Sequence, residues 1–222
     1  MSKMIRVTMN GVAKEFPEGT SYRSIVESMD GKSEIPVALV RVDGQLKELF
    51  HAPEEDCELE TVKINEPAGF RSFRRSMNFL FLTAIRNIAG EKVAGETILH
   101  HSMGSSFYFV IGDGVKADEA FLEKVTDEMH RLVEAKLPIV KSTVSVRKIR
   151  KYFREHFMVK KANLFRYRMS SVINVYELDG FVDYFYGYML PDTELLGTFE
   201  LIPYAEGCLL RMPEVSDLTK VP

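Results

Sequence analysis

The sequence predicts a two-domain α+β protein, and three patterns support this fold class. The dipeptide Asn10-Gly11 separates two short alternating runs, which is a strong short-range signal for a β-hairpin. Segments 72–88 and 118–135 repeat apolar residues at helical spacing. Between these regions, residues 65–69 contain Pro and Gly and form a short turn segment, where we expect the domain boundary.

The first 64 residues are expected to combine a hairpin, a helix and two further strands. Thr20 is expected to cap the helix at its N-terminus. The order β-β-α-β-β is typical of a small grasp-like α+β domain. The expected strands cover 4–9, 12–16, 37–42 and 58–64, and the helix covers 21–29.

The second domain is expected at 65–212 and a polar linker at 213–222. Ser72 and Ser145 are expected to cap its first and third helices. The expected helices cover 72–88, 118–135 and 145–157. The expected strands cover 105–111, 172–177, 181–186, 195–203 and 208–212.

The composition is that of a globular domain protein. Hydrophobic residues make up 45% and charged residues 27% of the 222 residues, and no apolar run reaches the length of a membrane-spanning helix. The N-terminus lacks the apolar region of a signal peptide, so a cytoplasmic protein is expected. Cys57 and Cys208 have no CxxC spacing and are interpreted as buried reduced thiols, without a bound metal.

Charge is unevenly distributed along the chain. Segment 141–168 holds ten Lys and Arg residues and one acid, while the rest of the chain holds 19 basic and 31 acidic residues. Such asymmetry marks either a phosphate- or RNA-binding surface or a solvated helix face, and both interpretations remain open. Aromatic residues interleave with the charges, although helical spacing turns most of them inward. The candidate surface residues are Arg147, Lys148, Lys151 and Arg154.

The first 64 residues resemble a TGS domain, a ubiquitin-like β-grasp fold. The resemblance rests on the ordered segment 7–20, the helix that follows it, Val42-Asp43-Gly44, and segment 54–60. Residues 70–212 resemble the second additional domain of threonyl-tRNA synthetase, which is related to alanyl-tRNA editing domains. Segments 73–79 and 180–191 match the two motifs that bind zinc or form the editing site in that family.

All four metal-binding positions of that family are replaced in this chain. The two His positions of the helix motif hold Arg75 and Phe79, and the Cys and His positions of the second motif hold Phe185 and Met189. Phenylalanine cannot ligate zinc, arginine repels a cation, and methionine is a poor zinc ligand. Editing chemistry is therefore not expected, and no catalytic residue is predicted.

The variant motifs are similar to the N-terminal region of uridine-kinase-like nucleoside kinases. The matching segments are 74–76, 101–104, 183–191 and 209–213. This resemblance implies a nucleoside kinase domain after the linker, which would bind ATP and Mg²⁺, and no cofactor in this chain. The function expected is non-catalytic ligand binding or regulation beside that kinase domain. The alternative is a tRNA- or RNA-binding module derived from threonyl-tRNA synthetase, with editing activity lost.

A degenerate editing pocket is the expected ligand site, for a nucleoside, nucleotide or other small molecule. Arg75 is the expected anion contact, because a guanidinium matches phosphate or carboxylate bidentately. Residues 90–97 have the glycine spacing of a P-loop, but Glu96 stands where a P-loop needs Lys. A phosphate-binding loop is therefore not expected there. Of His100 and His101, one is expected buried and the other exposed. The predicted pocket residues are Arg75, Asn78, His101, Asp183 and Tyr186.

The remaining partners follow from these interpretations. We expect contacts with tRNA under the alternative function, contacts with the chain's own kinase domain under the main one, and no membrane association. Tyr184, Tyr186 and Tyr188 alternate, so they are expected on one face of a strand, either as a packed sheet face or as a wall of the pocket.

Overall fold

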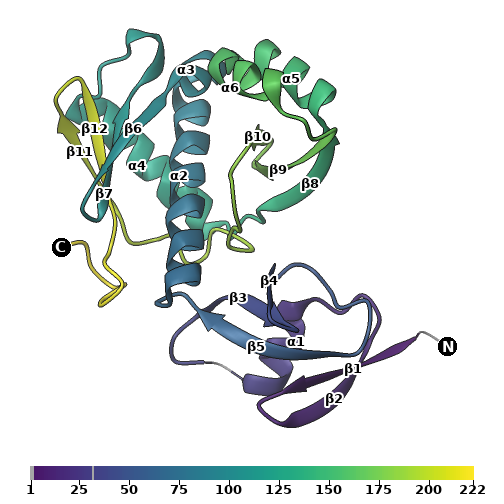
Figure 1. Cartoon of the computed structure of the whole chain (residues 1–222). Coiled ribbons are helices and arrows are strands. Elements are labelled where there is room, and N and C mark those ends of the chain that lie inside the picture. Colours follow the sequence, from purple (N-terminus) through teal and green to yellow (C-terminus); the bar gives the residue numbers. More distant parts are fainter. Residues whose placement is uncertain (1–2, 32) are drawn as a thin grey trace. The chain divides into compact units, whose positions relative to one another are not determined.

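The computed structural model describes residues 3–31 and 33–222, and Figure 1 shows the order of helices and strands in them. Contacts divide the chain into two compact units. The first unit contains the chain up to Ser76 together with Gly187–Pro191, and the second contains Met77–Tyr186 and Asp192–Pro222. The domains predicted at 1–64 and 65–212, with a linker at 213–222, stay predictions.

The first unit is built on a mixed five-stranded sheet with one helix against it, in the part of the chain that the structure describes. The sheet order is β2-β1-β5-β3-β4, with β1 and β5 parallel and the other pairs antiparallel. The elements are β1 (Met4–Met9), β2 (Val12–Pro17), α1 (Tyr22–Asp30), β3 (Val37–Val42), β4 (Gln45–Glu48) and β5 (Cys57–Lys63).

The N-terminal hairpin has the predicted turn. Asn10 and Gly11 have φ of 52° and 76°, so both lie in the left-handed region that a two-residue hairpin turn requires. The predicted inner face of the helix is also correct, because Tyr22, Ile25 and Val26 are buried in the core of this unit.

The cap predicted for α1 is wrong by one residue. The Ser21 hydroxyl accepts a hydrogen bond from the Ser24 backbone N–H and caps the helix. The Thr20 hydroxyl instead donates to the Pro17 carbonyl and closes the preceding turn. Both residue types can cap a helix, so the sequence alone could not select between neighbours.

The long helix α2 (Pro67–Ala89) begins earlier than predicted. Proline is favourable in the first turn of a helix, because its fixed φ is helical and its missing N–H would have no partner there. Ser72 is therefore not a cap; it is fully buried, and its hydroxyl donates to the Ala68 carbonyl one turn earlier. Gly69 is required for close packing, since a Cβ there would lie 2.1 Å from the Lys63 carbonyl oxygen.

The second unit combines helices with two antiparallel sheets among the described residues, ordered β11-β12-β7-β6 and β10-β9-β8. Its helices are the rest of α2, α3 (Glu91–Glu96), η1 (Gly112–Gly114), α4 (Glu119–Glu134), α5 (Val146–Glu155), α6 (Val159–Leu164) and η2 (Phe165–Tyr167). Its strands are β6 (Ile98–Met103), β7 (Ser106–Val110), β8 (Val140–Ser145), β9 (Val172–Leu178), β10 (Phe181–Asp183), β11 (Glu200–Tyr204) and β12 (Gly207–Arg211). The α+β class is thus confirmed.

The predicted helix cap at Ser145 is present, and Asp118 also caps α4; each side chain accepts a backbone N–H from the residue three positions on. Other predictions in this unit are wrong. Strand β10 ends at Asp183, so Tyr184, Tyr186 and Tyr188 do not share a strand face. Phe157 lies beyond the end of α5 with φ of 60° and is 44% exposed, instead of facing inward.

The end of the chain contacts strand β12, which precedes it in the sequence. The Arg211 guanidinium contacts Glu200 across β11 and β12 and donates to the Pro222 carbonyl. Asp217 accepts both the backbone N–H and the hydroxyl of Thr219 in a local turn. No helix among the described residues is long and apolar enough to cross a membrane.

Candidate functional site

Aromatic rings pack together at two of the four positions where the resemblance implies metal ligands. The rings of Phe79 on α2 and Phe185, just after β10, have centroids 5.0 Å apart, and Phe79 also contacts Phe181 at 6.0 Å. Phe79 is fully buried. Phe79 and Phe185 thus form a hydrophobic contact.

The other two replaced positions, Arg75 and Met189, lie in the first unit. Arg75 Nη1 donates to the Tyr188 carbonyl oxygen at 2.7 Å. A Cβ at Gly187, whose φ is +122°, would lie 2.6 Å from Arg75 Cζ. The guanidinium therefore packs flat against bare backbone at Gly187, and Met189 is fully buried nearby in sequence. The anion contact expected of Arg75 stays a prediction.

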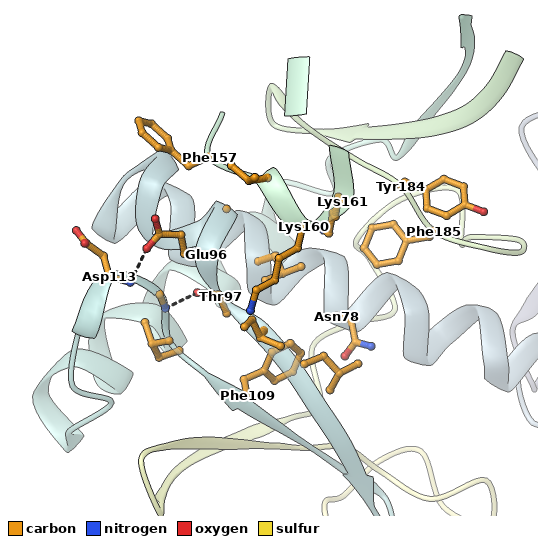
Figure 2. Close-up of a pocket in the computed structure, with 17 residues that line it drawn as sticks. Asn78, Glu96, Thr97, Phe109, Asp113, Phe157, Lys160, Lys161, Tyr184 and Phe185 are labelled. Atoms are coloured by element: carbon orange, nitrogen blue, oxygen red, sulfur yellow. Dashed lines mark hydrogen bonds between the residues drawn. The ribbon is translucent and has the colours of Figure 1, made fainter. Parts of the chain in front are cut away.

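An apolar pocket of about 790 Å³ lies within the second unit (Figure 2). Segments that are distant in sequence form it: α2, α3, β6, β7, η1, the region from Phe157 to α6, and the two residues after β10. Its apolar lining consists of Leu82, Ile98, Leu99, Phe109, Ile111, Phe157, Val159 and Phe185. Its polar lining consists of Asn78, Glu96, Thr97, Asp113, Lys160, Lys161 and Tyr184.

Several polar groups of the pocket already have partners inside the protein. Thr97 Oγ1 donates to the Val93 carbonyl at 2.7 Å and accepts from the Gly112 N–H at 3.0 Å. Glu96 Oε2 accepts from the Asp113 N–H at 3.2 Å, and Asp113 pairs with Lys92 at 2.6 Å. These bonds hold α3 and η1 together and fix one wall of the pocket.

A buried ion pair fixes another wall. Asp183 is fully buried, and its carboxylate pairs with Lys161 on α6. Its second oxygen accepts the backbone N–H of Tyr184 at 2.6 Å. Burial of a carboxylate is costly unless it is paired and hydrogen-bonded, so this pair anchors α6 to the end of β10.

Asn78 and Lys160 differ from their neighbours. Asn78 is 8% exposed, and its Oδ1 is buried without a hydrogen-bond partner among the described residues. Lys160 is exposed and has no ion-pair partner in the part of the chain that the structure describes. Figure 2 shows its side chain extending into the pocket, while the Tyr184 hydroxyl points away.

The structure separates the residues that the sequence predicted to form one ligand site. Asn78 lines the pocket. Asp183 does not line it, but it pairs with Lys161, which does. His101 and Tyr186 do not line it; Tyr186 is 83% exposed. Their ligand-binding roles stay untested. Sequence reasoning missed Lys160, which is hidden in a run of basic residues.

The prediction for the histidine pair is wrong. His100 and His101 are both exposed on β6, where the register with β7 shifts between Leu99 and His101. Both rings lie near Tyr108, with centroids 5.6 Å and 5.4 Å from it. An irregularity in an edge strand breaks the alternation of faces on which the prediction depended.

A basic hollow of about 700 Å³ lies on the same unit, along α5 and η2. Of the four predicted surface residues, Arg147, Lys151 and Arg154 line it, and Lys148 does not. Its other lining residues are Val146, Arg150, Glu155, Phe165, Arg166, Arg168 and Ser171. Six cations and a single acid therefore surround one concave surface.

Local contacts hold some of these cations in place. Arg168 Nη1 donates to the Tyr184 hydroxyl at 2.8 Å, and its guanidinium lies over the Phe165 and Tyr184 rings. Arg150 Nε is buried without a partner among the described residues. Glu155 lies only 3.7 Å from Lys151, so this acid offsets one charge of the hollow.

No group of three or more His, Cys, Asp or Glu side chains that could hold a metal occurs within residues 3–31 and 33–222. The P-loop-like segment is mostly the short helix α3 and follows α2 directly. Its Gly95 serves packing, since a Cβ there would lie 2.4 Å from the His156 carbonyl oxygen.

The chain is similar in sequence to about a third of the length of several threonine–tRNA ligases, as three relatives illustrate. The chain is 26% identical over 207 residues to the threonine–tRNA ligase of Symbiobacterium thermophilum, covering 92% of this chain and 31% of that protein. It is 28% identical over 199 residues to the Finegoldia magna enzyme, covering 88% of this chain and 31% of the enzyme.

A third relative is threonine–tRNA ligase 2 of Bacillus subtilis, with 25% identity over 205 residues, 90% of this chain and 31% of the relative. The chain thus spans about a third of the length of the curated relatives it matches. No protein-family model matches it.

Proposed function

We propose that this chain is a non-catalytic RNA-binding module, with tRNA as the RNA, in which editing activity has been lost. The basic hollow is the observation that carries this proposal. Arg147, Lys151 and Arg154 project from one helix, and Arg150, Arg166 and Arg168 complete the ring. Cations that release counterions from phosphates supply most of the affinity in RNA binding, and arginine matches phosphate in a bidentate manner.

Two features support RNA over a simple solvated helix face. The charges surround a concavity, so several can reach one phosphate backbone at once. Beside it, Tyr167 is 82% exposed, with the Arg166 guanidinium 5.6 Å from its ring. An exposed aromatic ring next to arginines is suited to stacking on an unpaired base. Similarity to threonine–tRNA ligases points in the same direction.

The aromatic contact between Phe79 and Phe185 supports the proposed loss of editing. Zinc requires nitrogen, sulfur or carboxylate ligands, and the rings of Phe79 and Phe185 provide none. We propose accordingly that the module recognises RNA without hydrolysing an ester. We also propose that the first unit, with its β2-β1-β5-β3-β4 sheet and single packed helix, is a TGS domain.

The kinase-associated role remains a second proposal, supported by the motif similarity at 74–76 and 183–191. In that case a following domain would bind ATP and Mg²⁺. The gene sequence beyond residue 222 tests it directly. A GxxxxGK[ST] motif there supports the kinase, and a synthetase core contradicts it.

Fluorescence anisotropy with labelled tRNA at low salt tests RNA binding. The triple variant Arg147→Ala, Lys151→Ala, Arg154→Ala should weaken binding by about 100-fold, because three phosphate contacts are lost. The control triple Lys116→Ala, Lys124→Ala, Lys148→Ala removes the same charge from exposed positions outside the hollow and should have little effect. Equal losses in both triples, or no binding by the unmodified protein, would refute the proposal.

A further inference from the structure

We infer that the apolar pocket is a binding site for a free nucleoside monophosphate, with the base inside and the phosphate at the mouth. This inference is independent of RNA binding at the basic hollow. A volume of about 790 Å³ falls within the range of small-molecule sites. The pocket lies within one compact unit, where its walls are fixed by internal bonds.

The buried amide is the observation that requires a ligand or water. Asn78 Oδ1 accepts no hydrogen bond among the described residues, although the residue is only 8% exposed. A buried polar atom without a partner lowers stability, so a native protein that keeps one usually pairs it with something else. Figure 2 shows this amide at the edge of the pocket, beyond the ring of Phe109.

The amide, the aromatic walls and the lysine together match a nucleotide. A side-chain amide offers a donor and an acceptor side by side, which pairs with the edge of a nucleobase. Phe109 and Phe185 provide aromatic surface against which a flat ring can pack. Lys160 extends into the pocket without an acidic partner in the described chain, so it is available for a phosphate.

The distribution of charge sets the orientation of the ligand. Glu96 and Asp113 lie at the α3–η1 wall, and repulsion keeps a phosphate away from them. Asn78 is nearly buried, while Lys160 is exposed. The base therefore enters first and the phosphate remains near solvent, where a single lysine can neutralise it.

Isothermal titration calorimetry with AMP, CMP, GMP and UMP, and with the matching nucleosides, tests the inference. We expect at least one nucleotide to bind with a Kd below about 1 mM, and its nucleoside to bind about tenfold more weakly, because Lys160 contacts only the phosphate. Lys160→Met should remove this difference, while Lys124→Met, on an exposed face of α4, should preserve it.

Asn78→Leu separates ligand recognition from folding. Leucine has nearly the same shape and removes the unpaired oxygen, so nucleotide binding should be lost while the Tm stays equal or rises. The triple variant of the basic hollow should keep its nucleotide affinity, which distinguishes the two sites.

Three results would overturn the inference. The first is no heat with any of the four nucleotides. The second is an equal affinity of the unmodified protein for a nucleotide and for its nucleoside, which would leave Lys160 without a phosphate to contact. The third is binding of an oligonucleotide ending in CCA with none of the free nucleotides, which would assign the pocket to an RNA terminus.

Discussion

The apolar pocket and the basic hollow lie in the same compact unit, but they are built in opposite ways. The pocket takes its walls from seven separate segments, and its lining includes the buried core side chains of Leu82, Phe109 and Ile111. The hollow takes its walls from one helix and the residues just after it, and most of its side chains are exposed. The pocket is therefore lined by segments that pack together in the fold, whereas the hollow lies on an exposed helical surface.

This difference separates two kinds of recognition. A pocket whose walls are fixed by internal bonds holds its polar groups at fixed positions, so it is suited to discrimination between small ligands. A surface ring of long cations adapts to a phosphate backbone and provides affinity with little sequence preference. Substitutions should therefore affect stability at the pocket and salt-dependent binding at the hollow.

The largest expected effect is on stability, at the aromatic cluster behind the pocket residue Phe185. Phe79→Ala removes a fully buried ring that contacts Phe181 and Phe185, and should lower the free energy of unfolding by about 3–5 kcal/mol. Arg147→Ala, in the hollow, should change it by no more than about 0.5 kcal/mol. Urea denaturation measures both values. Similar losses would show that the hollow is also part of the core.

The second largest effect is the difference in stability between breaking the buried ion pair Lys161–Asp183 and breaking the exposed ion pair Lys151–Glu155. Lys161→Met leaves the fully buried Asp183 carboxylate without its partner and should cost about 3 kcal/mol. Lys151→Met breaks the exposed pair with Glu155 and should cost less than about 1 kcal/mol.

A double variant, Lys161→Met with Asp183→Leu, is the control for the buried pair. It removes both charges together and should recover most of the stability lost in Lys161→Met. No recovery would mean that the Asp183 bond to the Tyr184 N–H, and not the ion pair, fixes this wall.

Salt dependence should distinguish the ligands of the two sites. The slope of log affinity for tRNA against log salt should fall in magnitude by about 2–3 when Arg147, Lys151 and Arg154 become Ala. A nucleotide in the pocket meets one lysine, so its slope should have a magnitude of about 1 at most. Titrations between low and physiological salt test this, and equal slopes would contradict the comparison.

The smallest effect concerns the thiols. Burial raises the pKa of Cys208 to about 12, and burial together with Asp43 also raises the pKa of Cys57. Since only the thiolate reacts and Cys208 is fully buried, iodoacetamide at pH 8 should modify Cys57 first. Cys208 pairs with pocket residue Phe109 across the sheet, so a bound nucleotide should slow its modification further.

A time course measured by mass spectrometry follows the modification of Cys57 and Cys208. The protective effect should vanish in Asn78→Leu, which loses the ligand, and tRNA at the hollow should not reproduce it. Faster modification of Cys208 than of Cys57 in the folded protein would contradict the assignment of this sheet to a rigid core.

Local patterns allowed much of the fold to be predicted. The turn at Asn10-Gly11, the buried face of α1 and the cap at Ser145 depend on neighbouring residues, and the structure confirms them. Strands β6 and β8 were missed because most of their residues are exposed, so they lack the alternation that identifies a half-buried strand.

The site was less predictable because it depends on tertiary contacts. Lys148 and Lys151 look equivalent in the sequence, and only the path of the following chain places one at the hollow and not the other. The motif similarity identified Asn78, but nothing local indicated that Lys160 would extend toward the same pocket. The sequence therefore indicated that segment 141–168 is basic. It did not indicate that some of these basic residues line the apolar pocket and others line the basic hollow.

The glycines of the pocket wall limit how this site can change. A Cβ at Gly112 would lie 2.3 Å from the Val93 carbonyl oxygen, as close as the contact described for Gly95. Neither position can accept a larger residue without moving backbone. Redesign or natural divergence of ligand preference is therefore restricted to side chains such as those of Phe157, Val159 and Lys160, which can be exchanged while the backbone stays in place.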